Sequence, residues 1–333
     1  MDCYWIKDSI KNQNVEEIYD IGHEIFRFSR GALSVVSACY NRTTRKSFAV
    51  NVIKKKVGYC PDNNDIGIFL KLNDINLMRV IEVFETWTHI NVIREHLTGD
   101  QLFNHFKKSG PYTESKVGRI TKQILSGIRY LHEYNIIHGN IKSENLIIVD
   151  SGEGNLILKI CDHIQSTIMH YDIYRLSIIA LPSLCPPEVL LSQIRTFALD
   201  MWAIGVCVFI LLCGYEPFYR EKITELYRAV ITADYSYNFN CESTSNALKD
   251  FLNHLLKANP KSRMNIINAL KHPWNEICIM KNQPLESIYQ QYVKCVGSIE
   301  DRMHEKVMDD IRRANDIFDK LILRNPYRTY KNK

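Results

Sequence analysis

The sequence predicts an α+β protein with two lobes, a small β-rich lobe followed by a larger, mainly helical one. Three observations lead to this prediction. Segments rich in β-branched and aromatic residues fill the first third of the chain. Helical periodicity dominates from Asp200 onward, and a hinge between the two patterns falls near residues 95–99. With 333 residues, the chain is long enough for one large domain or two medium lobes.

The β-rich part contains a predicted hairpin and further short strands. Residues 34–40 and 46–53 are rich in β-branched and aromatic residues, and the polar turn NRTTR separates them, which is typical of a hairpin. Residues 77–97 add two or three short strands with T-x-T-H as a turn. Between these segments, the mixed periodicity of residues 64–72 predicts one short helix.

The helical part begins after residue 114. Ser115 is a predicted N-cap for a helix that carries Ile120, Ile124, Ile128 and Leu131, which are spaced by four, four and three residues. A helix with this spacing presents one continuous apolar face to a core.

Two more elements follow. Residues 146–150 and 156–162 flank the turn SGEGN and predict a second hairpin. The longest apolar run, residues 201–213, is too short to span a bilayer as a helix and predicts a core helix instead.

Composition argues against several classes of function. The net charge is only +5 and no long Lys/Arg run occurs, so we expect neither nucleic acid nor a membrane as a partner. The ten cysteines are scattered without a C-x-x-C pair, and the first residues are too polar for a signal peptide. Reduced thiols in a cytoplasmic protein are the expected interpretation.

Four separated stretches carry a family resemblance. They are SRGALSVV (29–36), FAVNVIKK (48–55), HGNIKSENL (138–146) and LKICDHI (158–164). In this order and spacing the chain resembles a eukaryotic protein kinase, and ILLCGYEPFY and LTGDQLF resemble the calcium/calmodulin-dependent kinase group. The resemblance implies the bilobal protein-kinase fold.

The resemblance also implies a domain division. Residues 1–21 form an N-terminal extension, and residues 22–275 form the kinase domain, with an N-lobe over 22–95 and a C-lobe over 99–275. Residues 276–333 form a tail with an amphipathic helix.

Several residues depart from the family pattern at positions that act together. Asn51 stands where the family has the lysine that grips the α/β-phosphates, and its usual glutamate partner aligns with the shorter Asp65. Asn140 stands at the catalytic-base position, where an amide cannot accept a proton near neutral pH. Beside it, Gly139 replaces an arginine, and Ile164 replaces a glycine of the metal motif.

Other positions keep the family's residue types. Asn145 and Asp162 align with the two metal ligands, and Lys142 aligns with the residue that steadies the transferred phosphate. The resemblance places the following residues around a nucleotide: Ser29, Gly31, Val36, Ala49, Glu95, Leu97 and Leu146. Ser29 puts a side chain where backbone should approach the phosphates. We therefore expect ATP and Mg²⁺ to bind weakly or not at all.

Arg94 aligns with the residue at the back of the nucleotide pocket, a position that is usually apolar or Thr. A buried guanidinium needs a partner. We hypothesise that Arg94 pairs with Asp65 or Asp162 and replaces the cation missing at position 51. The alternative is that Arg94 turns outward to solvent.

The functional prediction is a pseudokinase that acts as a scaffold or as an allosteric partner of an active kinase or another signalling protein. The alternative is a serine/threonine protein kinase that transfers the ATP γ-phosphate with Arg94 or Lys54 as its cation. In the resembled group the tail binds calmodulin. Calmodulin is the less favoured partner here, because residues 301–325 carry six acids and six bases.

Overall fold

The computed structural model describes residues 10–27, 34–55, 66–109, 112–150, 156–164, 182–191, 195–237 and 244–277. Contacts divide the chain into two compact units. Unit 1 draws on residues 1–109, 118–170 and 266–271, and unit 2 on residues 110–117, 171–265 and 272–333. The predicted tail helix and most of the segment after Asp162 lie outside the described residues.

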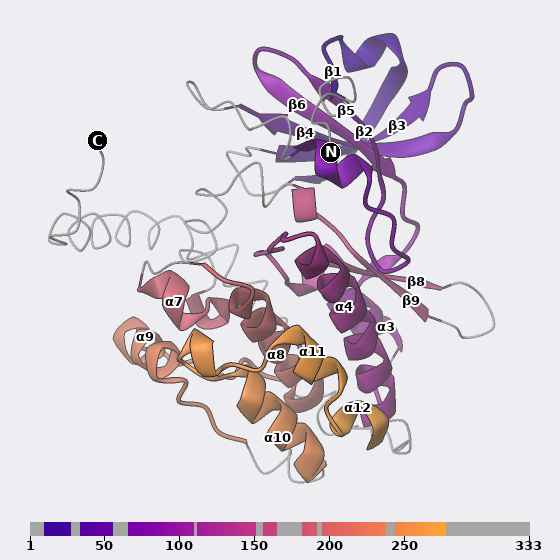
Figure 1. Ribbon diagram of the computed structural model, residues 1–333. Coiled ribbons are helices and arrows are strands. Elements are labelled where there is room, and N and C mark those ends of the chain that lie inside the picture. Colours follow the sequence, from indigo (N-terminus) through magenta and orange to yellow (C-terminus); the bar gives the residue numbers. More distant parts are fainter. Residues whose placement is uncertain are drawn as a thin grey trace, which may run out of the picture. The chain divides into compact units, whose positions relative to one another are not determined.

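A six-stranded sheet in the order β1-β5-β6-β4-β3-β2 forms one part of unit 1 (Figure 1). Its strands are β1 (Ile10–Lys11), β2 (Tyr19–Arg27), β3 (Ser34–Asn41), β4 (Ser47–Lys54), β5 (Val80–Glu85) and β6 (His89–Glu95). The pairs β3–β4 and β5–β6 are antiparallel, which confirms the predicted first hairpin and the strands within residues 77–97. The β4–β6 pair is also antiparallel and sets Ala49 opposite Arg94.

The sheet begins before residue 22, where the sequence predicted the domain to start. β1 pairs in parallel with β5, and the 3₁₀ helix η1 (Val15–Glu17) follows it. The Lys11 ammonium lies 2.8 Å from a carboxylate oxygen of Glu82, and the Tyr19 hydroxyl donates to the other oxygen at 3.1 Å. Tyr19 also packs in a buried cluster with Phe84. Part of the predicted N-terminal extension is therefore integral to this sheet.

A second, three-stranded sheet of unit 1 has the order β7-β8-β9. Its strands are β7 (Asp100–Gln101), β8 (Leu146–Asp150) and β9 (Leu156–Ile160). The antiparallel β8–β9 pair confirms the second predicted hairpin. The unit also contains α3 (Leu102–Ser109) and the short elements η2 (Ile68–Leu70), η3 (Ser143–Asn145) and α11 (Ile266–Leu270). η2 lies within residues 64–72, where a short helix was predicted.

Helix α4 (Glu114–Glu133) is the predicted helix of residues 115–131. All four predicted apolar positions, Ile120, Ile124, Ile128 and Leu131, are buried. The cap is Thr113 rather than Ser115, because the Thr113 hydroxyl accepts a hydrogen bond from the Lys116 N–H at 3.0 Å. Ser115 lies one residue inside the helix.

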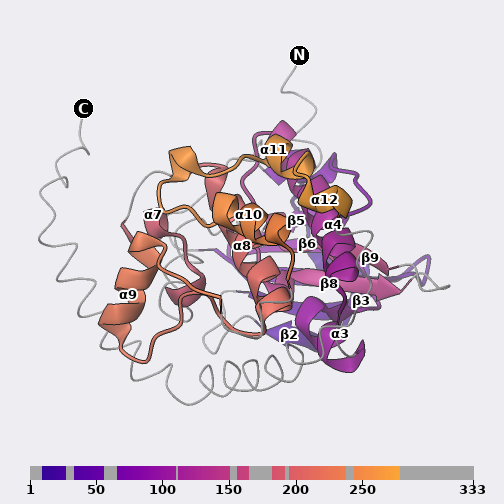
Figure 2. The same cartoon turned by 90° about the horizontal axis from the view of Figure 1, so that it is seen from below.

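Unit 2 is helical. Its elements are η4 (Pro182–Leu184), α7 (Pro187–Leu190), α8 (Ala198–Cys213), α9 (Ile223–Thr232), α10 (Asn246–Leu255), η6 (Pro260–Ser262) and α12 (Trp274–Ile277). Helix α8 is buried on nearly all sides and packs beside α10 (Figure 2), which confirms the predicted core helix. Within the described residues, none of the helices combines the length and the hydropathy needed to cross a bilayer.

Candidate functional site

Unit 1 contains a cavity of about 230 Å³. Its lining comes from both sheets, from the connection between β6 and β7, and from the residues that follow β9. The lining residues are Val36, Ala49, Met78, Arg94, Glu95, His96, Leu97, Gly99, Gln101, Glu144, Ile147, Cys161 and Asp162. Six of the residues that the sequence placed at the nucleotide site are among them.

Val36 and Ala49 bring apolar side chains to the cavity from β3 and β4. The prediction of Leu146 falls one residue short, because Leu146 is fully buried and Ile147 lines the cavity instead. Successive residues of a strand point to opposite faces, so the residue after Leu146 is the one that faces the cavity. Ser29, Gly31 and Asp65 lie outside the described residues.

Glu95 and Leu97 line the cavity at the predicted hinge. The Glu95 carboxylate accepts hydrogen bonds from the Arg79 N–H at 2.8 Å and from the Lys159 ammonium at 3.0 Å. The Glu95 side chain is therefore held by a cation on β9. Its negative charge is balanced on the protein side of the cavity.

Arg94 extends from the end of β6 toward Asp162. One guanidinium nitrogen, Nη1, lies 3.4 Å from Oδ1 of Asp162 and 2.7 Å from the sulfur of Met78. Only 14% of the Arg94 side chain and 4% of the Asp162 side chain are exposed. The hypothesis that Arg94 pairs with Asp162 is therefore confirmed, and the alternative of an outward-turned side chain is wrong.

The charge state of Asp162 reflects two opposing effects. Burial raises the pKa of the Asp162 carboxyl, while Arg94, followed by His138 and Lys142, lowers it. The backbone of Asp162 has φ 64°, in the left-handed region. Among the described residues of the D-H-I motif, this conformation falls on Asp162 and not on Ile164.

Asn51 lies in the middle of β4 and is only 1% exposed. It pairs with Val36 on β3 and Val92 on β6. Asn51 is not among the residues that line the cavity. The positive charge at this end of the cavity therefore comes from Arg94 and not from position 51.

The loop from His138 to Asn145 is held by its own polar groups. The Asn140 N–H donates to Nδ1 of His138 at 3.2 Å, so the proton of the neutral ring lies on Nε2, which donates to the Cys161 carbonyl at 2.9 Å. His138 is fully buried. The Asn140 carbonyl accepts from Nδ2 of Asn145 at 2.7 Å. The loop keeps a defined shape around an amide at position 140.

The two predicted metal ligands differ in how they fit a divalent cation. Asn145 is 1% exposed, and its Oδ1 is buried without a hydrogen-bond partner, as expected for an atom that accepts from a ligand or contacts a cation. The Asp162 carboxylate, in contrast, already faces the guanidinium of Arg94. Lys142 occupies the N-cap position of η3, without a side-chain capping hydrogen bond, and adds positive charge near Asp162. The set fits Mg²⁺ poorly.

His163 follows Asp162 and is completely buried. Its ring packs against Phe69, with 5.5 Å between the ring centroids. Burial lowers the pKa of His163 to about 3, so the ring is neutral at physiological pH. The geometry indicates that His163 packs in the core.

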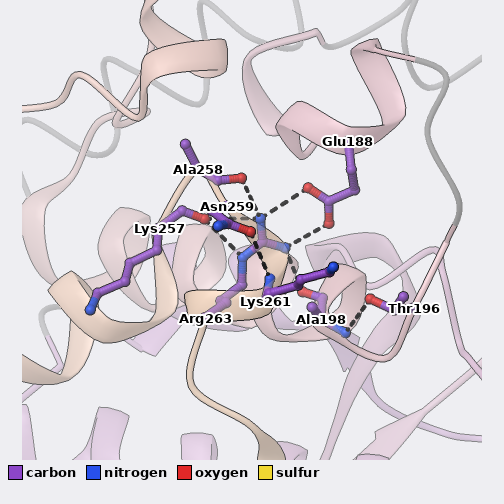
Figure 3. Close-up of polar contacts among 8 residues, drawn as sticks. All are labelled: Glu188, Thr196, Ala198, Lys257, Ala258, Asn259, Lys261 and Arg263. Atoms are coloured by element: carbon purple, nitrogen blue, oxygen red, sulfur yellow. Dashed lines mark hydrogen bonds and ion pairs between the residues drawn. The ribbon is translucent and has the colours of Figure 1, made fainter.

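Unit 2 contains a buried ion pair between Glu188 and Arg263 (Figure 3). The two guanidinium nitrogens lie 2.7 and 2.9 Å from the carboxylate oxygens, and neither side chain is exposed. Arg263 also donates to the carbonyls of Ala198 and Lys257. This bidentate pair joins α7 to the segment that follows η6.

Asp250, His254 and His272 of unit 2 are close enough to suggest a metal site. However, Nδ1 of His272 accepts from the Trp274 N–H at 3.2 Å, so the proton of the neutral ring lies on Nε2. That nitrogen is 3.0 Å from Oδ2 of Asp250 and donates to it. A ring in this tautomer has no lone pair left for a metal, and the cluster is structural.

Comparisons with known proteins agree with this geometry. The protein kinase domain family matches residues 24–275. Calcium/calmodulin-dependent protein kinase type IV of Rattus norvegicus is 34% identical over 274 residues, which cover 81% of this chain and 56% of the relative. Myosin light chain kinase A of Dictyostelium discoideum is 34% identical over 265 residues, covering 78% of this chain and 88% of the relative.

A third relative, serine/threonine-protein kinase H1 of Homo sapiens, is 33% identical over 249 residues, which cover 74% of this chain and 59% of the relative. The chain thus spans less than two thirds of the length of several of the relatives it matches. The family match and the fold agree over the same residues. The chain belongs to the protein kinase family, within the calcium/calmodulin-dependent kinase group.

Proposed function

We propose that this chain is a pseudokinase, whose function is to bind a signalling protein or an active kinase as a scaffold or allosteric regulator. The observation that carries the proposal is the Arg94–Asp162 ion pair, at 3.4 Å, inside the nucleotide cavity. In the family this aspartate holds a metal ion that neutralises the phosphates. Here it faces a protein cation instead.

The missing base supports the same proposal. Transfer moves the γ-phosphoryl group of ATP to a Ser or Thr hydroxyl, yields ADP, and releases the hydroxyl proton to a base. The amide of Asn140 cannot take that proton. Loss of a general base lowers the rate by about 10²- to 10⁴-fold. Catalytic groups act as a unit. The reduction in rate from the missing base and the reduction from the missing lysine at position 51 therefore do not simply multiply.

A partner protein in the cytoplasm is part of the proposal. The five described buried cysteines are free thiols, as expected in a reducing compartment. Calmodulin is less favoured as the partner than an active kinase, because calmodulin targets are basic and the tail is charge-balanced.

The second candidate is a slow serine/threonine kinase. Burial raises the pKa of Asp162, and the guanidinium of Arg94 and the ammonium of Lys142 oppose this rise; the two cations would also attract phosphate oxygens. In this mechanism Arg94 replaces the lysine that the family has at position 51, and Lys142 steadies the transferred phosphoryl group. The two candidates differ in whether phosphate reaches an acceptor.

The decisive experiment measures radiolabelled phosphate transfer from ATP to a generic basic peptide. We expect incorporation by the wild-type chain to equal that of an Asp162→Ala control. Asn140→Asp tests the missing base directly. Phosphate incorporation by the wild type that disappears in Asp162→Ala would exclude the pseudokinase. If the incorporation were also lost in Arg94→Met, the result would favour the slow kinase that uses Arg94 as its cation.

A further inference from the structure

We infer that the cavity of unit 1 binds an adenine nucleotide without a divalent metal, with Arg94 supplying the positive charge. The inference rests on the proposed function, because it concerns the same cavity. It concerns binding alone and involves no phosphate transfer.

The place of a metal at Asp162 is already held by a cation. Mg²⁺ binds carboxylate oxygens at about 2.0–2.1 Å. Nη1 of Arg94 is 3.4 Å from Oδ1 of Asp162, so an ion bound to that oxygen would lie within about 5.5 Å of the guanidinium. Two cations at this separation, in a site where both side chains are at least 86% buried, repel each other strongly.

The remaining metal ligand is too weak to hold the ion alone. Oδ1 of Asn145 is buried without a hydrogen-bond partner, but it is a neutral amide oxygen. Mg²⁺ sites in proteins use one or two carboxylates together with phosphate oxygens and water. Among the described residues that line this cavity, Asp162 is paired to Arg94, and none offers an uncommitted carboxylate at the place where a metal would bridge the phosphates.

Arg94 retains capacity to bind an anion. Its Nε is buried without a hydrogen-bond partner, and its contact with Asp162 is a single nitrogen-to-oxygen approach rather than a bidentate pair. Guanidinium groups bind phosphate through two parallel hydrogen bonds. A phosphate that reaches Arg94 would provide the acceptor that Nε lacks.

The other acidic groups around the cavity do not prevent this. Glu95 accepts from the Lys159 ammonium at 3.0 Å, and Glu144 accepts from the Ser143 hydroxyl at 2.8 Å. The cavity joins the apolar side chains of Val36 and Ala49 to the guanidinium of Arg94, so it offers an apolar surface for a flat heterocycle and a cation for phosphates. Adenosine diphosphate and triphosphate combine such a group with phosphates.

The experiment measures the Kd of ATP by calorimetry for the full chain, in EDTA and again in Mg²⁺. We expect the same Kd in both conditions for the wild type. Arg94→Met should weaken binding in EDTA by about 10- to 100-fold, the value of one charge-assisted hydrogen bond. Arg79→Met is the matched control, because Arg79 is an exposed arginine of the same unit and should leave the Kd unchanged.

A second variant protects the test against misfolding. Arg94→Met leaves the buried Asp162 without its cation, so Arg94→Met combined with Asp162→Asn removes both charges at once. This double variant should also lose nucleotide affinity in EDTA, and its cooperative unfolding would show that it is folded. The inference would be overturned if the wild type bound nucleotide only with Mg²⁺, or bound no nucleotide in either condition. It would also be overturned if both Arg94 variants bound ATP in EDTA as tightly as the wild type does.

These outcomes are distinct from a failure of the proposed function. A chain that binds no nucleotide is still a pseudokinase, whereas phosphate incorporation that Asp162→Ala abolishes contradicts the pseudokinase even if binding needs no metal. Metal dependence that appears only in Arg94→Met supports the inference, because that change frees Asp162 for the ion.

Discussion

The buried pair of Glu188 and Arg263 allows a quantitative prediction for Glu188→Gln. Neither side chain is exposed, and both carboxylate oxygens accept from the guanidinium. Removing one partner of such a pair costs about 3–5 kcal/mol, because the other charge stays buried without compensation. The carbonyls of Ala198, 2.6 Å from Nη1, and of Lys257, 3.0 Å from Nη2, remain as partners and place the effect near the lower end.

We therefore expect Glu188→Gln to lower the free energy of unfolding by about 3 kcal/mol. For a chain of this size, with an entropy of unfolding of roughly 0.7 kcal/mol/K, that corresponds to a fall in Tm of roughly 4 °C. Urea unfolding followed by circular dichroism measures the free energy directly. Glu225→Gln is the matched control, since Glu225 pairs with Lys222 at 3.3 Å with more than half of each side chain exposed, and an exposed pair contributes under about 1 kcal/mol.

A loss for Glu188→Gln no larger than for Glu225→Gln would refute the reasoning. Arg263→Met completes a double-mutant cycle with Glu188→Gln. We expect a coupling energy of about 0.5–3 kcal/mol, because the double variant no longer contains an uncompensated charge. Additive effects of the two changes would mean that the carbonyls alone stabilise the guanidinium.

Two further changes test packing. Gly99→Ala should destabilise unit 1 by about 1–3 kcal/mol in urea unfolding, because its Cβ would lie 2.3 Å from the backbone oxygen of Ile148; wild-type stability would contradict this. Trp274→Phe should lower the free energy of unfolding by about 1.5–3 kcal/mol, because the indole N–H donates at 2.9 Å to the buried carboxylate of Glu114, and an unchanged urea midpoint would contradict that role.

The elements of this fold were predictable where one local signal dominated. Runs rich in apolar and β-branched residues on both sides of a polar turn defined the β3–β4 and β8–β9 hairpins, and four apolar residues at helical spacing defined α4. The cap of α4 was misplaced because Thr113 and Ser115 are both good N-cap residues two positions apart, and only the hydrogen bond to Lys116 distinguishes them. The pairing of β1 with β5 was not predictable, since two residues carry no periodicity.

The candidate site shows the same limit. The Arg94–Asp162 contact could be inferred, because a buried guanidinium requires a partner and few carboxylates align nearby. Ile147 was missed in favour of Leu146 because the run LIIVD is apolar on both faces, so alternation does not reveal which side faces the cavity. Met78 and Cys161 also line the cavity, and ordinary apolar residues give no signal in a sequence that would identify them.

The changes at positions 51 and 94 are physically coupled, and this gives a last prediction. Ala49 lies directly opposite Arg94 in the β4–β6 pair, and Asn51 is two residues farther along β4, so it shares a sheet face with Ala49 and lies diagonal to Arg94. Asn51→Lys would place a second cation on that face at a position that is 1% exposed.

We expect Asn51→Lys alone to lower the free energy of unfolding, because like charges on one face of a sheet are destabilising and a buried ammonium needs a partner. In the double variant with Arg94→Met, the new lysine can take over the pairing with Asp162, so the two changes should be coupled by about 0.5–3 kcal/mol. Urea unfolding of the four proteins in the cycle measures this coupling. Strictly additive effects would show that positions 51 and 94 are independent and that Arg94 does not occupy the place of the missing lysine.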